Sequence, residues 1–146
     1  MTEAALADQH AHADALGRVP LFQGFSKKEL ETVLICAQEA RFEPGAEVVR
    51  EGGHGAGFHL ILEGSASVTQ GGRPVRSLGP GDSFGDIALI DGGMRTASVT
   101  ADSPLHTLSL VEWEFKPLLL EHPQLAVKLL VELCRRLREA EARAPV

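Results

Sequence analysis

The sequence predicts a mainly β fold with flanking helices. Its central part is an antiparallel β-roll of about eight strands, a jelly-roll-like double-stranded β-helix. Glycines interrupt residues 41–111 roughly every 8–12 residues, which is the spacing of turns in sandwiches and barrels. Before and after this region, apolar residues recur at helical intervals instead. A chain of 146 residues is long enough to form one domain with its own core.

We expect an N-terminal extension over residues 1–15, followed by a domain over residues 16–143. The extension contains His10 and His12, but no third metal ligand lies nearby, so a solvated helix or frayed terminus is expected. The domain begins with an apolar group that includes Leu16, Val19, Leu21, Phe22 and Phe25. Ser26 and Glu29 then have the spacing of a capping box, which predicts the start of a helix.

The predicted roll covers residues 41–111, and its strands are short. Residues 58–62 and 65–69 are two strands joined at Gly64, and the pair Gly71–Gly72 is the expected tip of a hairpin. A further strand follows Pro104, where apolar and polar residues alternate. Short strands that close on one another leave few exposed edges, as a roll requires.

Two C-terminal helices are expected over residues 112–143. The first covers residues 112–120, and Pro123 begins a second that runs to about Ala142. Leu125, Val127 and Leu129 are expected to face the roll. A second apolar seam has 3-4 spacing and consists of Leu130, Leu133, Leu137 and Ala140. This seam either packs back on the roll or forms a homodimer through the 123–142 helix.

Charge and composition exclude several classes of protein. The net charge of −6 argues against a nucleic-acid-binding surface, which is usually basic. No stretch approaches the roughly 18 apolar residues of a membrane helix, and the N-terminus does not resemble a signal peptide. Cys36 and Cys134 lie far apart and outside any CxxC motif. We therefore expect buried or half-buried thiols in a reducing cytosol, and a cytoplasmic protein.

The stretch 79–99 contains the features of an anion site. A turn at 79–82 leads to Phe84-Gly85, and a short helix then starts at Asp86. The first N–H groups of a helix have no partner within it, and a glycine permits close approach of a ligand. Arg95, just before the next strand, can bind a phosphate through two parallel hydrogen bonds. Asp86 would repel that anion, so its expected partner is a hydroxyl, and the pair suggests a sugar phosphate.

This stretch resembles the phosphate-binding cassette of the cyclic nucleotide-binding domain family, found in cAMP receptor proteins and kinase regulatory subunits. The matching motifs are Phe84-Gly85-Asp86-Ile87-Ala88-Leu89 and Arg95-Thr96-Ala97-Ser98-Val99. Shorter matches are Glu43-Pro44-Gly45, Glu51-Gly52, Leu60-Ile61-Leu62-Glu63-Gly64 and Leu78-Gly79-Pro80-Gly81-Asp82. The resemblance covers about residues 16–143.

The resemblance implies a role for each residue of this cassette (residues 84–97). Arg95 and the N–H groups of Ile87 and Ala88 should bind the cyclic phosphate, while Gly85 and Asp86 face the ribose 2′-OH. Thr96 adds a hydroxyl to the phosphate or the base, and Phe84 and Ala97 complete the ligand-binding set. The family usually carries Glu where this chain has Asp86, and Asp is shorter by roughly 1.5 Å. The implied lid over the base is on the last helix, with Leu133, Arg135, Arg138, Ala140 and Glu141 as candidates.

The resulting functional hypothesis is a sensor without enzymatic activity. It binds cAMP or cGMP, needs no cofactor, and moves its C-terminal helices to signal to an unknown effector protein. The family associates Thr96 with tolerance of cGMP, whereas a bacterial context would favour cAMP. Because the sequence stops at Val146, shortly after the last helix, we expect a stand-alone protein without a helix-turn-helix.

Two other hypotheses remain. Asp86 and the leucine seam are also consistent with a degenerate member of the fold that serves as a nucleotide-independent interaction or dimerisation module. The third hypothesis is a metal-dependent cupin, because His54, His59 and Glu63 match part of that motif. The histidine needed after Pro80-Gly81 is missing, however. We therefore expect His54 and His59 to be ordinary turn and strand residues and predict no metal site.

Overall fold

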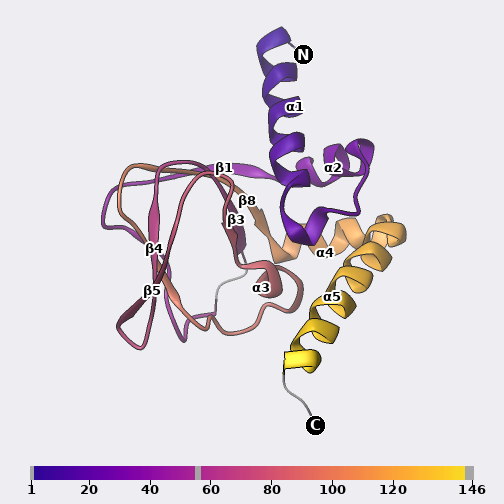
Figure 1. Cartoon of the computed structure of the whole chain (residues 1–146). Helices are drawn as coiled ribbons and strands as arrows, with labels where there is room; N and C mark the ends of the chain where they lie inside the picture. Colours follow the sequence, from indigo (N-terminus) through magenta and orange to yellow (C-terminus); the bar gives the residue numbers. More distant parts are fainter. Residues whose placement is uncertain (1, 55–56, 144–146) are drawn as a thin grey trace. The chain divides into compact units, whose positions relative to one another are not determined.

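The computed structural model describes residues 2–54 and 57–143. The chain divides into two compact units, one of which is Ile35–Lys116 and holds all the strands described below (Figure 1). The other combines Met1–Leu34 with Pro117–Val146 and holds most of the helices. Each unit is described separately.

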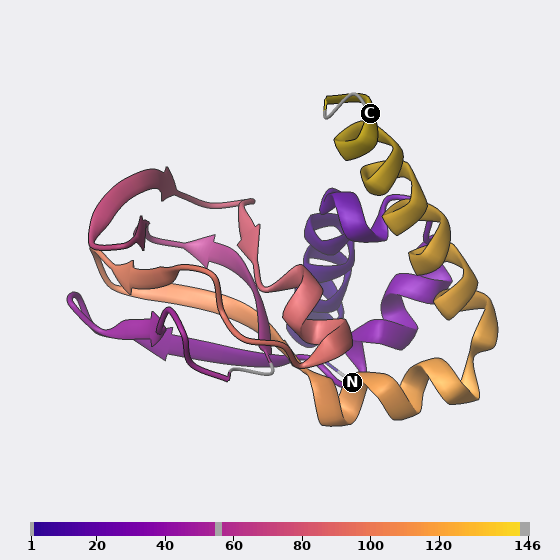
Figure 2. The ribbon, with the colours of Figure 1, turned by 90° about the horizontal axis from the view of Figure 1, so that it is seen from below.

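The Ile35–Lys116 unit is a roll of eight antiparallel strands in two four-stranded sheets. One sheet has the order β1-β8-β3-β6, and its strands are Gln38–Phe42, Leu105–Val111, Gly57–Glu63 and Ser83–Phe84. The other has the order β2-β7-β4-β5, with strands Glu47–Val49, Ser98–Ala101, Ala66–Gln70 and Arg73–Leu78. Figure 2 shows these strands from below. The predicted fold class is confirmed, and the first strand begins three residues before the expected start of the roll.

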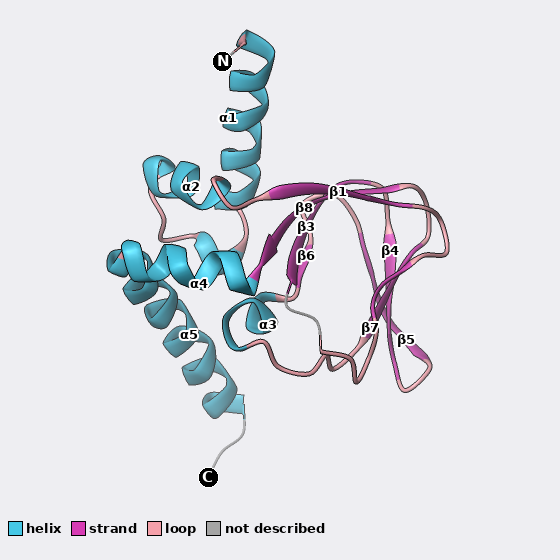
Figure 3. Cartoon of the chain, turned by 180° about the vertical axis from the view of Figure 1, so that it is seen from behind, coloured by secondary structure: helices cyan, strands magenta, loops and turns pink. Residues whose placement is uncertain are grey.

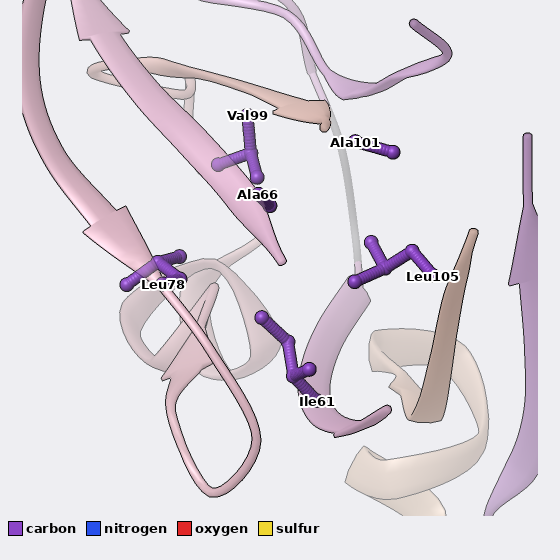
Figure 4. Packing of buried hydrophobic residues seen from close by; sticks show 6 residues of the cluster. All are labelled: Ile61, Ala66, Leu78, Val99, Ala101 and Leu105. Carbon is purple, nitrogen blue, oxygen red and sulfur yellow. The ribbon is translucent and has the colours of Figure 1, made fainter. Parts of the chain in front are cut away.

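The core of the roll comes from alternate residues of its strands. The fully or almost fully buried members are Ile61, Ala66, Leu78, Val99, Ala101 and Leu105 (Figure 4). Phe42 and Phe84 are half-buried and pack against this cluster. Because successive side chains of a strand point to opposite faces, His59 shares the inward face of β3 with Ile61. Thr107 likewise shares the inward face of β8 with Leu105.

The turn before the cassette forms as expected. The Asp82 carboxylate accepts a hydrogen bond from the Gly79 N–H at 2.9 Å, and the N–H of Gly81 donates to the Ile61 carbonyl at 2.9 Å. These bonds fix the turn to β3. The short helix α3 (Asp86–Asp91) follows β6 and also contacts β3 (Figure 3). The expected hairpin at Gly71–Gly72 joins β4 and β5.

The other unit contains α1 (Glu3–Gly17), the short helix η1 (Pro20–Phe22), α2 (Lys27–Leu34) and α5 (Pro123–Arg143). The predicted capping box is confirmed: the Ser26 N–H donates to Glu29 Oε1 at 2.8 Å, and the Glu29 N–H donates to Ser26 Oγ at 3.2 Å. Lys128 of α5 forms an ion pair with the same Glu29. The apolar residues expected near the start of the domain are all buried, namely Leu16, Val19, Leu21, Phe22 and Phe25.

Several details of the predicted helices differ. The helix α1 extends past residue 15, and α4 covers Glu112–Glu121. Leu125 and Leu129 are buried, but Val127 is 58% exposed, so its inward assignment was wrong. It lies two positions from each of them, which places it on another side of a helix with 3.6 residues per turn. Cys134 is exposed rather than buried, whereas Cys36 is half-buried. In the leucine seam, Leu130 and Leu137 are 61% and 59% exposed.

Among the described residues, no helix combines the length and apolar character needed to span a membrane.

Candidate functional site

The backbone of Arg95 is held by a pair of glycines between β2 and β3. The Arg95 N–H donates to the Gly53 carbonyl at 2.9 Å, and the Gly52 N–H donates to the Arg95 carbonyl at 2.8 Å. Together these bonds make a short antiparallel contact between segments that are more than 40 residues apart in sequence. The side chain of Arg95 therefore starts from a fixed backbone position, although Arg95 is not part of a regular strand.

The Arg95 side chain is directed into the roll unit and is only 9% exposed as a whole residue. Its Nη2 donates to the carbonyl of Gly57, at the start of β3. Its Nε is also buried and has no hydrogen-bond partner among the described residues. Burial lowers the pKa of Arg95 because desolvation penalises the charged form, but a guanidinium stays protonated in proteins. A buried cationic donor without a partner costs free energy, so the site favours an anionic acceptor.

Gly85 allows this close packing. Its φ of +90° lies in the left-handed region, and a Cβ at this position would collide with the Gly57 carbonyl oxygen. The same Cβ would lie 2.7 Å from Arg95 Nη1. Gly85 is also the N-cap of α3 and accepts the first helical hydrogen bond from the Leu89 N–H at 2.9 Å. The structure therefore brings the start of α3 against the guanidinium, as the cassette hypothesis requires.

The first turn of α3 supplies further donors. Ile87 and Ala88 follow Asp86 in this turn, where backbone N–H groups have no partner within the helix. Asp86 is half-buried and is the first residue of the helix. An anion at this point would thus meet backbone donors on one side and the Arg95 guanidinium on the other.

The remaining predicted residues are more dispersed. Phe84 is half-buried in β6, Ala97 is half-buried, and Thr96 is exposed. The Thr96 carbonyl accepts a hydrogen bond from Gln70 Nε2 at 3.1 Å. The lid candidates lie on α5, in the other unit: Leu133 is half-buried, and Arg135, Arg138, Ala140 and Glu141 are exposed. Arg135 pairs with Glu132 and Glu139 of its own helix, and the lid role stays a prediction.

His59 was not included among the predicted ligand-binding residues, yet it lies beside them. Its ring stacks on Phe84 with centroids 5.1 Å apart and meets Phe42 edge-on at 5.8 Å. Its Nδ1 lies 2.9 Å from Thr107 Oγ1. Burial, and secondarily the positive charge of Arg95, lowers the pKa of His59 to about 4. Apolar residues occupy both faces of β3, so alternation along the strand could not reveal which face His59 shares with the roll interior.

The end of the cassette meets the start of α4. Gly92 caps α3 with a φ of +65°. A Cβ at this position would collide with the Glu112 carboxylate, because the carboxyl carbon would be only 2.8 Å away. Glu112 is the first residue of α4 and also pairs with Lys116 at 2.8 Å. The sequence offers no signal for this contact, because two complete strands, β7 and β8, separate the two residues.

Within residues 2–54 and 57–143, no group of three His, Cys, Asp or Glu side chains is arranged to hold a metal ion. The histidines weighed for a cupin site have different surroundings. His54 forms a short β-bridge with Met94, and His59 lies inside the roll.

The chain is similar to several known proteins. The family model described as a cyclic nucleotide-binding domain matches residues 39–122. The cyclic AMP receptor protein of Thermus thermophilus is 32% identical over 127 residues, which cover 84% of this chain and 59% of that protein. The chain spans less than a third of the cAMP-dependent protein kinase regulatory subunits that it also matches.

Two solved structures extend the comparison. The N-terminal domain of a transcriptional regulator from Streptomyces coelicolor A3(2) superposes with a TM-score of 0.85 at 27% identity, covering 91% of this chain and 96% of that chain. The regulatory domain of Toxoplasma gondii PKA, crystallised with cAMP, gives a TM-score of 0.73 at 28% identity, with coverages of 94% and 52%.

Proposed function

This chain belongs to the cyclic nucleotide-binding domain family, and we propose that it is a sensor that binds cAMP or cGMP at the cassette. The relatives named above include a cyclic AMP receptor protein and a kinase regulatory domain crystallised with cAMP. In this proposal the chain binds and releases the nucleotide unchanged and requires no cofactor. The output is a change in the C-terminal helices that an effector protein recognises.

The observation that carries the proposal is the buried guanidinium of Arg95, whose Nε has no partner among the described residues. A cyclic phosphate carries one negative charge and two exocyclic oxygens, which suit a guanidinium and the backbone donors of Ile87 and Ala88. Asp86, at the same helix start, is an acceptor for the ribose 2′-OH.

The contact between Gly92 and Glu112 suggests how binding reaches the helices. A ligand that tightens the start of α3 would shift its far end, where Gly92 touches the first residue of α4. Pro117 lies inside α4, and a proline there removes one helical hydrogen bond. The helix can therefore bend near the place where one unit ends and the other begins.

The test is calorimetric titration of the whole chain with cAMP and cGMP in parallel. Arg95→Ala should weaken binding by about 2–5 kcal/mol, because one partner of a buried charged pair is lost. Arg76→Ala is the matched control, since Arg76 is an exposed arginine on β5 of the same roll, and it should bind as the wild type does. Equal affinity of the Arg95 variant and the wild type would refute the assignment.

A second candidate function is a nucleotide-independent dimerisation or interaction module. Exposed apolar side chains on α5 favour it, namely Val127, Leu130, Val131 and Leu137. Three of them, at positions 127, 130 and 137, fit the 3-4 spacing of a helix-packing seam. Sedimentation velocity with and without cAMP separates the two functions. A monomer that binds nucleotide supports the sensor, whereas a nucleotide-indifferent dimer that Leu130→Glu dissociates supports the module.

A further inference from the structure

His59 is the ionisable side chain that faces the core of the roll from β3. It lies between two aromatic rings, Phe42 of β1 and Phe84 of β6, and Thr107 of β8 engages its Nδ1. Three strands thus fix the plane and the direction of the imidazole. A histidine held in this way cannot turn outward to water when it gains a proton.

The other ring nitrogen lies near Gly57, at the start of β3. His59 Nε2 would lie 3.7 Å from a Cβ built on Gly57, and the carbonyl of Gly57 accepts the hydrogen bond from Arg95. Gly85 packs against the same carbonyl, and its neighbour Phe84 stacks on the imidazole. His59, Arg95 and Gly85, the N-cap of α3, are therefore all neighbours of Gly57.

From this arrangement we propose that His59 is a ligand-contacting residue, and that it takes up a proton when the cyclic phosphate binds beside Arg95. The inference rests on the proposed nucleotide binding and adds a specific coupling to it. The proton comes from solvent, Nε2–H donates to a phosphate oxygen, and Nδ1–H donates to Thr107. Binding therefore becomes tighter as the pH falls.

The charges around His59 support this direction. In the ligand-free protein, burial and then Arg95 disfavour the imidazolium, which lowers the pKa of His59 to about 4. An anion between the two cations offsets the repulsion from Arg95 and supplies an acceptor. The pKa of His59 in the complex then returns toward its ordinary value of about 6.5.

The other groups packed against the imidazole do not compete for this proton. Phe42, Phe84 and Thr107 have no charge near neutral pH. Arg41 and His106 occupy the adjacent positions on β1 and β8, whose side chains point to the opposite face. Asp82 and Asp86 each lie two residues from Phe84. Asp82 accepts from the Gly79 N–H, and Asp86 is the group assigned to the ribose.

The experiment measures proton uptake directly. The whole chain is titrated with cAMP and with cGMP at pH 6.0, 7.0 and 8.0, each in two buffers of different ionisation enthalpy. With a pKa near 6.5 in the complex, affinity should rise about fourfold from pH 8.0 to pH 6.0, with uptake of about three quarters of a proton per ligand at pH 6.0. These values lie above the pI of about 5.5, so solubility is retained.

Two variants assign the effect to His59. His59→Gln keeps a side chain that can reach Thr107 but cannot ionise, so both the pH dependence of the affinity and the proton uptake should vanish. His106→Gln, on the outward face of β8, is the matched control and should retain both. Wild-type binding with no proton uptake overturns this inference alone, as does uptake that survives in His59→Gln. Absence of binding to either nucleotide at every pH overturns the proposed function and this inference together.

Discussion

At Arg95, backbone groups of the described residues orient a buried positive charge. The neighbouring main chain of Gly52 and Gly53 fixes its backbone, and the Gly57 carbonyl accepts from its side chain. A carbonyl is a weaker partner for a guanidinium than a carboxylate or phosphate is. An arriving phosphate can therefore replace this weaker bond. The arrangement keeps the guanidinium ordered before the ligand arrives, which lowers the entropic cost of binding.

Asp86 is the residue whose contribution to nucleotide binding is easiest to isolate. If it accepts a hydrogen bond from the ribose 2′-OH, Asp86→Asn should weaken cAMP binding about ten- to a hundredfold, because a hydrogen bond to a charged group is worth about 1.5–3 kcal/mol. Competition binding against 2′-deoxy-cAMP completes a double-mutant cycle. The variant should then bind the two ligands almost equally.

The matched substitution at this position is Asp86→Glu, which restores the side-chain length of the Glu that the family usually has here. It should raise the affinity for cAMP and leave that for 2′-deoxy-cAMP almost unchanged. If Asp86→Asn affects both ligands alike, the carboxylate acts through the fold of α3 and not through the ribose.

Local residues were predictable from the sequence, and distant ones were not. The capping box of Ser26 and Glu29 depends on a spacing of three residues, and the turn ending at Asp82 depends on four neighbours. His59 was assigned as an ordinary strand residue, because its neighbours Phe84 and Thr107 are 25 and 48 positions away. The resemblance identified the residues of the cassette. Which histidine lies beside them depends on the register of β3 against β6 and β8.

Among the elements, α3 and α4 meet at Gly92 and Glu112. Gly92→Ala should destabilise the chain by the roughly 1–2 kcal/mol of a left-handed alanine, plus a smaller cost for moving the flexible Glu112 carboxylate away from the new Cβ. Urea unfolding measures this change in the free energy of unfolding. Trp113 is 68% exposed and is the one tryptophan of the chain, so its fluorescence reports on α4 during the same titration.

A second substitution separates the two causes. In Gly92→Ala/Glu112→Ala the collision is gone and only the backbone strain remains, so part of the lost stability should return. Gly79→Ala is a suitable control, because a Cβ there meets nothing within 4 Å and needs no left-handed backbone. If the changes in the free energy of unfolding caused by the two single substitutions add exactly in the double variant, Gly92 and Glu112 are not coupled.

For the whole molecule, the half-buried imidazole of His59 links stability to pH. The pKa of His59 is about 4 in the folded chain and near 6.5 when unfolded, so the unfolded state binds the proton first as the pH falls. The contribution of His59 to the free energy of unfolding is therefore fully present above pH 6.5 and declines between pH 6.5 and pH 4. The loss should be about 1 kcal/mol at pH 6 and about 3 kcal/mol at pH 4, measured by urea unfolding without ligand.

The comparison that isolates this effect is His59→Gln. Its stability should depend less steeply on pH over the same window, so the difference from the wild type should shrink or change sign as the solution is acidified. A constant difference at every pH would mean that His59 has the same pKa in the folded and the unfolded chain.

The two cysteines give the molecule a built-in site for selective labelling. Burial, together with the charge of Glu114, raises the pKa of Cys36 to about 11, so almost none of it is thiolate at neutral pH. Cys134 is exposed on α5, the helix that the sensor hypothesis expects to move. A maleimide dye added briefly at pH 7 should therefore attach at Cys134 without any engineered mutation. Energy transfer between Trp113 and that dye would then report on movement between the two units of the native chain while nucleotide is titrated.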